Sequence, residues 1–254
     1  MGHVTREGYK FRQNFCVPCH GTDASTYLKP AAFMDMAQEI AYWAAQELGF
    51  GYDDLHVHHT AWVLSRMHFH FADPPRWRDD VSLYTWHKGA DGLFYLRDFY
   101  LQDPEGRRLV TCTSSWVVID ELSRRLVRPE ELQERLSVEG VVVEDAIAER
   151  APKVAMPRGA DPEPAGEHTV VYSDIDLIGH TNNARYMVWA MDCIDYETAS
   201  ARRVKDVYIN FNKETTPGTT VQLFRLKTEE EGATVYYVEG RVDGKSAFSV
   251  KLVF

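Results

Sequence analysis

Residues 172–195 read YSDIDLIGHTNNARYMVWAMDCID, which predicts a strand that passes through a polar turn into a helix. Gly179 permits a left-handed backbone conformation that other residues resist. Asn182 or Asn183 can cap the helix by accepting a hydrogen bond from one of its first free amides. The helix, expected over residues 183–198, is apolar over a wide arc, which predicts burial on most of its sides.

Two titratable side chains, Asp176 and His180, flank this turn. A carboxylate and an imidazole at the amino end of a buried helix make a candidate catalytic centre. The free N–H groups around Gly179, Asn182 and Asn183, together with the positive end of the helix dipole, are suited to hold a carbonyl oxygen as it becomes negative. An aspartate at such a position can also serve only to bind the backbone of the turn, so both interpretations of Asp176 stay open.

The same succession of elements occurs twice, with corresponding elements roughly 150 residues apart, which indicates an internal duplication. In each half a strand leads into a long helix, and consecutive strands joined by short turns follow. We expect helices at 29–48 and 183–198, and strands at 9–17, 60–71, 80–88, 93–103, 107–120, 168–173, 205–213, 219–227, 234–241 and 245–253. This order predicts an α+β fold in which an antiparallel sheet curls around one helix in each of two units, 1–120 and 168–254.

A linker over residues 121–167 joins the two units. Pro129 starts a short charged helix, expected over 130–136, at a position where its missing N–H costs nothing. A segment rich in proline and glycine follows over 152–166, and we expect it to be extended and exposed. A linker of this length lets the second unit return beside the first, so that the two sheets can join edge to edge and hide two edge strands.

The overall composition excludes several classes of protein. The chain is 44% hydrophobic and carries a net charge of -10, which argues against a nucleic-acid-binding surface. No apolar run reaches the roughly 18 residues of a membrane span, and the first residues lack the apolar core of a signal peptide. We therefore expect a cytoplasmic protein that binds neither nucleic acid nor membrane.

Two patterns could suggest a metal or a haem. Cys16-Val-Pro-Cys-His20 matches the pattern of covalent haem attachment and could also form half of a zinc site. No second C-x-x-C occurs, and the segment is typical of the opening strand, so the simpler interpretation of two thiols along a strand is favoured. The histidines of His56-Val-His-His59, with His68 and His70, give no ligand set from spacing alone. We expect no metal and no organic cofactor.

Several motifs together resemble one known family. They are residues 172–186, AWVLSRM at 61–67, TSSWVVID at 113–120 with RRLVR at 124–128, and NKET at 212–215. In this order and spacing, over nearly the whole chain, they look like the acyl-acyl-carrier-protein thioesterases of plants and bacteria. The resemblance implies a double hotdog fold, with two long central helices wrapped by antiparallel sheet. It also implies hydrolysis of fatty acyl thioesters of acyl carrier protein to free fatty acid, without a cofactor.

The resemblance also implies roles for single residues. Asp176, His180 and Glu214 match the family's Asp, His and Glu, whereas Ile178 stands where the family has Asn. Loss of one oxyanion donor would cost about 3 kcal/mol, or about a hundredfold in rate. The implied mechanism uses water: Glu214 orients or deprotonates it, His180 assists proton transfer, and Asp176 fixes the turn. Glu214 could instead be an ordinary charge at the end of a strand, and Thr215, where the family often has Cys, weakens the case for a cysteine nucleophile.

The duplication separates the two units by function. Aligning their turns places residues 23–27 against 176–180, so Tyr27 takes the place of His180 and the first unit lacks the base. This leaves the first unit free to shape the acyl pocket, as the resemblance implies. Its helix offers Phe33, Met36, Ile40 and Trp43 either as pocket lining or as plain core.

Docking of a carrier protein poses an electrostatic problem, since acyl carrier proteins are acidic and so is this chain. A local basic patch is needed. The candidate clusters are Arg124, Arg125 and Arg128, or Arg202, Arg203 and Lys205. If neither binds a carrier, acyl-CoA becomes the better substrate, and a non-catalytic acyl-binding protein or a hydratase on the same fold are further alternatives. The sequence fits a monomer or a homodimer and leaves the acyl chain length open.

Overall fold

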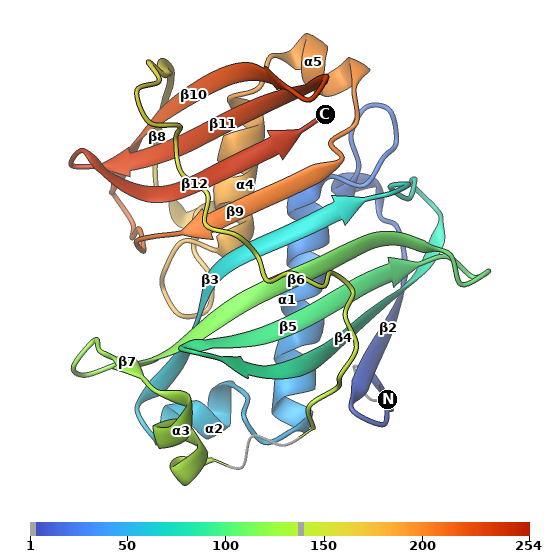
Figure 1. Ribbon diagram of the computed structural model, residues 1–254, viewed down its shortest axis with the longest axis vertical. Helices are drawn as coiled ribbons and strands as arrows, with labels where there is room; N and C mark the ends of the chain where they lie inside the picture. Colours follow the sequence, from blue (N-terminus) through green and yellow to red (C-terminus); the bar gives the residue numbers. More distant parts are fainter. Residues whose placement is uncertain (1–3, 137–139) are drawn as a thin grey trace.

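The computed structural model describes residues 4–136 and 140–254. Over these residues the chain forms one antiparallel sheet that wraps around two long helices, α1 and α4 (Figure 1). The helices are α1 (Pro30–Glu47), α2 (Tyr52–Val57), α3 (Pro129–Arg135), α4 (Asn183–Asp192) and α5 (Tyr196–Ala201). The strands are β1 (Thr5–Glu7), β2 (Lys10–Cys16), β3 (Thr60–Phe71), β4 (Asp80–Asp91), β5 (Phe94–Gln102), β6 (Arg108–Asp120), β7 (Leu126–Val127), β8 (Glu163–Thr169), β9 (Asp206–Phe211), β10 (Thr220–Glu230), β11 (Ala233–Val242) and β12 (Lys245–Val253).

Helix α1 forms where the sequence predicts it, to within one residue at each end. Pro30 occupies the first helical position, where no N–H is needed. The helix ends before Gly49, whose φ of +77° continues the chain in the left-handed conformation. Alanines and aromatic or branched residues alternate on its buried face, so the helix packs closely against the sheet.

The helix predicted over 183–198 is wrong in its second half, because α4 ends at Asp192 and a separate short helix, α5, begins at Tyr196. Asp195 lies between them with an extended ψ of 126°. Its carboxylate accepts hydrogen bonds from Tyr236 Oη and Arg225 Nη1, both at 2.8 Å. These contacts, made with strands far along the sequence, stabilise Asp195 outside the helix.

The two halves join edge to edge, as expected, through β3 and β9. The order of the main sheet is β1-β2-β4-β5-β6-β3-β9-β12-β11-β10-β8, and the antiparallel β3–β9 register runs from Arg66 opposite Asn210 to His70 opposite Asp206. At this joint Asp206 Oδ1 lies 3.1 Å from His68 Nε2 and 3.0 Å from His70 Nδ1. One hydrophobic core, with residues from both halves, fills the space between the sheet and the two helices.

The linker lies against the sheet in its first part and is extended and largely exposed over residues 152–166, as its composition predicts. Residues 141–154, here called the strap, cross the outer face of the sheet (Figure 1). The amide of Val142 donates to the carbonyl of His87, and Trp86 Nε1 donates to the carbonyl of Glu144, each at 2.9 Å. Farther along the strap, Ala151 and Val154 are buried. The strap covers aromatic side chains on the outer face of β4 and β5, namely Tyr84, Trp86 and Tyr100, whereas most of residues 152–166 are exposed, as expected.

The opening strand of the second half also differs from its expected bounds. Strand β8 begins at Glu163 and ends at Thr169, and residues Tyr172–Asp174 form a 3₁₀ turn in place of the end of the expected strand. Among the described residues, no helix is long and apolar enough to cross a membrane.

Candidate active site

The 176–180 turn is built by one carboxylate oxygen. Asp176 Oδ1 accepts hydrogen bonds from the amides of Ile178 at 3.0 Å and His180 at 3.3 Å, and Gly179 sits at a φ of +81° that favours glycine. In the first half, Asp23 Oδ1 accepts from the amides two and four residues later at 2.8 and 2.9 Å. Because Asp23 makes the same bonds in a turn without histidine, these bonds hold the backbone and so orient His180.

Glu214 lies beside this turn because the residue after it is anchored to α4. The carbonyl of Thr215 accepts from the amide of Thr181 at 3.0 Å, and the amide of Thr215 donates to the buried Tyr186 hydroxyl at 3.1 Å. The side chain of Glu214 then places Oε2 3.1 Å from His180 Nε2. Both side chains are about one third exposed, so water and substrate can reach them.

Arg124 completes a row of three side chains. Its guanidinium pairs with Glu214 Oε1, the carboxylate oxygen that does not face His180. Arg124 lies in the turn after β6, in the first half of the chain, and its φ of +58° is unusual for a residue other than glycine. The sequence singled it out only as a docking candidate, although it belongs to the RRLVR motif of the resemblance. The site therefore draws on both halves.

The backbone amides expected to bind an oxyanion are mostly occupied. Acceptors within the protein take the N–H groups of Ile178, Gly179, His180, Thr181 and Asn182. Asn182 Oδ1 caps α4 by accepting from the amide of Ala184 at 2.8 Å. Over the described residues, the first backbone N–H left is that of Asn183, the first residue of α4, and the side-chain amides of Asn182 and Asn183 also have no acceptor. Of the three residues predicted for oxyanion binding, Asn183 is thus the one that offers both a backbone and a side-chain donor.

A narrow apolar cavity opens beside Asn183. Its walls come from α1, from strands β3, β5 and β6, and from the start of α4. They are Met34, Ala37, Gln38, Leu64, Met67, Phe99, Trp116 and Asn183. Of the helix residues that the sequence offered as lining, Phe33 and Ile40 are fully buried in the core, and none of the four lines this cavity. The residues of α1 that line it are Met34, Ala37 and Gln38.

The corresponding turn of the first half lacks both titratable groups. The amide of Leu28 donates to the carbonyl of Pro75 at 2.9 Å, as that of Thr181 does to Thr215. This equivalence puts Pro74 in the place of Glu214 and Tyr27 in the place of His180. The ring of Tyr27 lies between the guanidinium groups of Arg76 and Arg203, 4.1 and 4.7 Å from its centroid.

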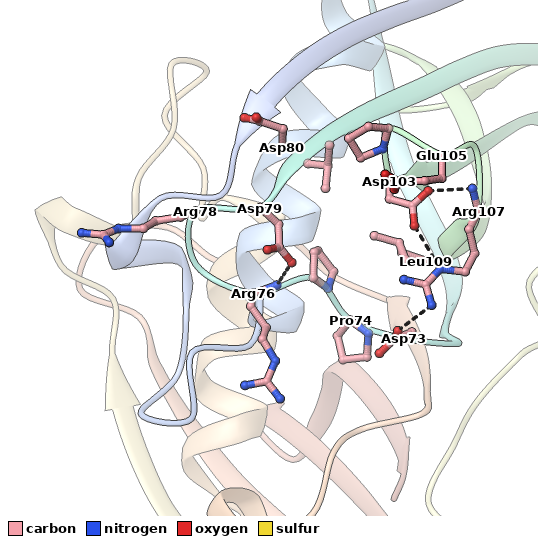
Figure 2. A pocket seen from close by; sticks show the side chains of 13 residues that line it. Asp73, Pro74, Arg76, Arg78, Asp79, Asp80, Asp103, Glu105, Arg107 and Leu109 are labelled. Carbon is pink, nitrogen blue, oxygen red and sulfur yellow. Dashed lines mark hydrogen bonds and ion pairs between the residues drawn. The ribbon is translucent and has the colours of Figure 1, made fainter.

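A surface depression of about 420 Å³ lies elsewhere (Figure 2). The loop between β3 and β4 and the turn between β5 and β6 form it, and Arg107 pairs there with two aspartates. Arg107 lies 3.2 Å from Asp73 and 3.0 Å from Asp103. Its lining includes neither His180 nor Glu214, so the depression is separate from the candidate active site.

The thiols and the remaining histidines lie apart from this site. Cys193 is buried in the core, where desolvation raises the pKa of its thiol to about 11. Cys16 ends β2 and Cys19 lies in the 3₁₀ turn after it, both exposed. Within residues 4–136 and 140–254, no group of three or more His, Cys, Asp or Glu side chains is arranged to hold a metal ion.

Comparison with known proteins agrees with this architecture. Residues 8–135 match the acyl-ACP thioesterase N-terminal domain and residues 161–254 match the acyl-ACP thioesterase C-terminal domain. The chain superposes on an acyl-ACP thioesterase from Bacteroides thetaiotaomicron with a TM-score of 0.85, at 21% identity over 97% of this chain and 98% of the other. It superposes on a 12:0-ACP thioesterase from Umbellularia californica with a TM-score of 0.82, at 20% identity over 97% and 94% of the two chains.

Plant relatives are similar in sequence. The chain is 24% identical to the chloroplastic oleoyl-acyl carrier protein thioesterase 1 of Arabidopsis thaliana, over 92% of this chain and 68% of the relative. It is 27% identical to the chloroplastic palmitoyl-acyl carrier protein thioesterase of the same plant, over 84% and 54%. The chain thus spans about half to two thirds of the length of these relatives. The double hotdog prediction is confirmed, and the chain belongs to the acyl-ACP thioesterase family.

Proposed function

We propose that this protein hydrolyses fatty acyl thioesters of acyl carrier protein, with the reaction at the 176–180 turn. The observation that carries the proposal is the 3.1 Å approach of His180 Nε2 to Glu214 Oε2 at the start of α4, beside an apolar cavity. An imidazole next to a carboxylate can activate water. The cavity, at about 10 Å³, marks where an acyl chain would have to open a path between α1 and the sheet. The names of the relatives support this substrate class.

In the proposed mechanism His180 is the base. Arg124 and His180 occupy opposite oxygens of Glu214, so this carboxylate is suited to hold the imidazole in one tautomer. With Nε2–H directed at Glu214, Nδ1 keeps its lone pair and can take a proton from water. This gives Glu214 a positioning role toward His180, in place of the role of orienting or deprotonating the water that the sequence predicted.

The remaining steps follow from the chemistry of a thioester. The water oxygen bonds to the carbonyl carbon, and the oxygen of that carbonyl becomes negative beside the free donors of Asn183. The carbon–sulfur bond then breaks, and His180 returns its proton to the departing sulfur. The products are a fatty acid and the carrier thiol. Ile178, half-exposed at the turn, has no side-chain donor, so in this proposal Asn183 supplies the contact that the family's Asn would give.

We further propose a division of labour between the predicted units, 1–120 and 168–254. Seven of the eight residues around the apolar cavity belong to the first unit, which is therefore suited to hold the acyl chain. The second unit supplies His180, Glu214 and Asn183. Exposed Arg125 and Arg128 follow Arg124 along the chain and form the basic patch best placed to meet an acidic carrier.

Hydrolysis of matched acyl-carrier-protein and acyl-CoA thioesters tests this function. We expect thiol release from both carriers to be measurable and kcat/KM to be higher for the carrier protein. Equal values for the two carriers would favour an acyl-CoA thioesterase. Tight binding of acyl thioesters with no thiol release at any chain length would contradict hydrolysis and favour a binding protein.

Substitution of Asn183→Ala is expected to lower kcat by about a hundredfold, since it removes a side-chain donor from the oxyanion. The matched control is Asn182→Ala, which removes the helix cap instead and is expected to cost about 1 kcal/mol of stability with little change in kcat. Steady-state kinetics and thermal unfolding of both variants distinguish the two roles. Unchanged kcat in Asn183→Ala would contradict the assignment of the oxyanion donor.

Substitution of Arg124→Ala is expected to lower kcat by about tenfold on both carriers, because a charge-assisted contact that orients Glu214 is lost at a half-exposed position. Arg124→Lys, which keeps the charge, is expected to recover part of the rate. The neighbouring Arg125→Ala serves as the control. If Arg124 only docked the carrier, its loss would raise KM for the carrier protein and leave hydrolysis of acyl-CoA unchanged.

A further inference from the structure

Arg97 is a buried cation on the inner face of the first half's sheet. It lies in β5 between Tyr95 and Phe99, which share its side of the strand, and it is 6% exposed. Desolvation lowers the pKa of its guanidinium to about 10, so the side chain is still a cation at neutral pH. A buried charge of this kind is costly unless it is paired and fully hydrogen-bonded.

The protein supplies little of that pairing. A guanidinium has five N–H donors. Over residues 4–136 and 140–254, Arg97 donates one side-chain hydrogen bond, to Thr85 Oγ1 at 3.2 Å, and forms no ion pair. The nearby His87 is buried as well, and desolvation together with the charge of Arg97 lowers the pKa of its imidazole to about 4. His87 is therefore neutral at pH 7 and offers no counter-charge.

The position of Arg97 follows from the strand register. Phe99 and Trp116 line the apolar cavity. In the β5–β6 ladder Phe99 is opposite Cys112, Arg97 is opposite Ser114, and Tyr95 is opposite Trp116. Arg97 thus occupies the row between the two cavity-lining aromatic residues. The Ser114 hydroxyl donates to the Arg97 carbonyl at 3.0 Å and accepts from Trp116 Nε1 at 2.8 Å, which ties this row to the cavity wall.

The helix that covers this row carries small side chains. Ala37 lines the cavity, and Ala45 packs in the cluster that contains Tyr95. Ala41, halfway between them along α1, is buried in the same core cluster as Phe99. Arg97, with the hydroxyl groups of Thr85 and Ser114, therefore lies next to the cavity wall, in the row between Phe99 and Trp116, and is not itself among the residues that line the cavity.

We propose that this protein prefers acyl thioesters whose chain carries an oxygen atom remote from the thioester, as a hydroxyl or carboxylate group, and that Arg97 binds that oxygen. This inference rests on the proposed function, and deepens it by naming the acyl class. A saturated chain leaves the donors of Arg97 without partners, whereas a chain with a distal oxygen satisfies them. A hydrogen bond to a charged group of this kind corresponds to a preference on the order of 10- to 100-fold.

The test compares acyl-carrier-protein thioesters of equal chain length that end in a methyl, a hydroxyl or a carboxyl group. The unaltered protein is expected to show a higher kcat/KM for one of the oxygenated chains, and the two oxygenated arms decide between a neutral and an anionic group. In Arg97→Met the preference is expected to disappear or reverse, with the methyl-ended chain hydrolysed at least as fast. The matched control is Arg66→Met on β3, which is separated from β5 by β6 in the sheet; the Arg66 guanidinium lies over Phe94, and the variant should keep the preference.

Two measurements keep the inference separate from folding and from the proposed function. If Arg97→Met does not fold, the preference of the unaltered protein decides, because equal kcat/KM for all three ends at every chain length overturns the proposal. If no thioester is hydrolysed at all, the proposed function fails. In that case, isothermal calorimetry measures the affinity of the unaltered protein for free fatty acids and for their hydroxylated counterparts. Equal affinity for the two overturns the role of Arg97.

Discussion

Replacement of His180 by alanine is expected to lower kcat for acyl-carrier-protein hydrolysis by about a thousandfold, the typical contribution of a positioned general base. The imidazole is the group beside Glu214 that can both take a proton from water and return it to sulfur. Loss of the ring leaves the cavity and the 176–180 turn intact, because Asp176 binds the backbone amide of residue 180 and not its side chain. KM is therefore expected to change little. Thiol release under single-turnover conditions measures the effect.

The control for this variant is His56→Ala. His56 lies on α2, its side chain is 60% exposed, and its nearest carboxylate oxygen, on Glu121, is 3.7 Å away. We expect its kcat to match that of the unaltered protein. A loss of less than about tenfold in His180→Ala would show that the imidazole does not carry the proton in the rate-limiting step. Glu214 would then be the base, as the sequence first suggested.

Replacement of Gly240 by alanine is expected to destabilise the protein by about 3 kcal/mol, at the upper end of the usual cost of overpacking. A Cβ atom at this position would lie 2.1 Å from Cε1 of Phe248. Phe248 is fully buried, and its ring centroid is 5.1 Å from that of Tyr186 and 6.2 Å from that of Trp189. The ring has no free space to move into. Urea denaturation followed by tryptophan fluorescence measures the change.

A double-mutant cycle separates steric conflict from an effect on the backbone. Phe248→Ala alone creates a cavity and is itself destabilising, but it removes the atoms that a Cβ at position 240 would meet. Gly240→Ala is therefore expected to cost less than about 1 kcal/mol when Phe248 is already alanine. An equal cost in both backgrounds would mean that strain of the β11 backbone, and not the ring, causes the loss.

Local patterns in the sequence predicted most of the architecture. The bounds of α1 follow from Pro30 and Gly49, residues that act on their own turn of backbone, and the repeated succession of elements predicted two units that each combine a helix with several strands. The break after α4 could not be found in this way. It depends on Arg225 and Tyr236, which reach Asp195 from strands that are 30 and 41 residues away in sequence.

The candidate site shows the same limit. Sequence alone identified His180 and Glu214, whose side chains the fold brings together. It did not pair Arg124 with Glu214, because that contact joins residues 90 positions apart and from different halves. It also treated the amides of the turn as free, whereas most of them are used to form the turn itself. What a backbone group is free to bind depends on hydrogen bonds that only the three-dimensional structure reveals.

The β3–β9 ladder limits how the two halves of this protein can be separated or exchanged. Each strand satisfies the edge amides and carbonyls of the other, and Arg124 contacts Glu214 only while the halves remain together. A gene fragment encoding either half would yield a polypeptide with an unprotected strand along one side, a surface that invites self-association. Exchange of halves between family members therefore requires that β3 and β9 come from the same protein or fit each other equally well. This holds even where the catalytic and acyl-binding residues are interchangeable.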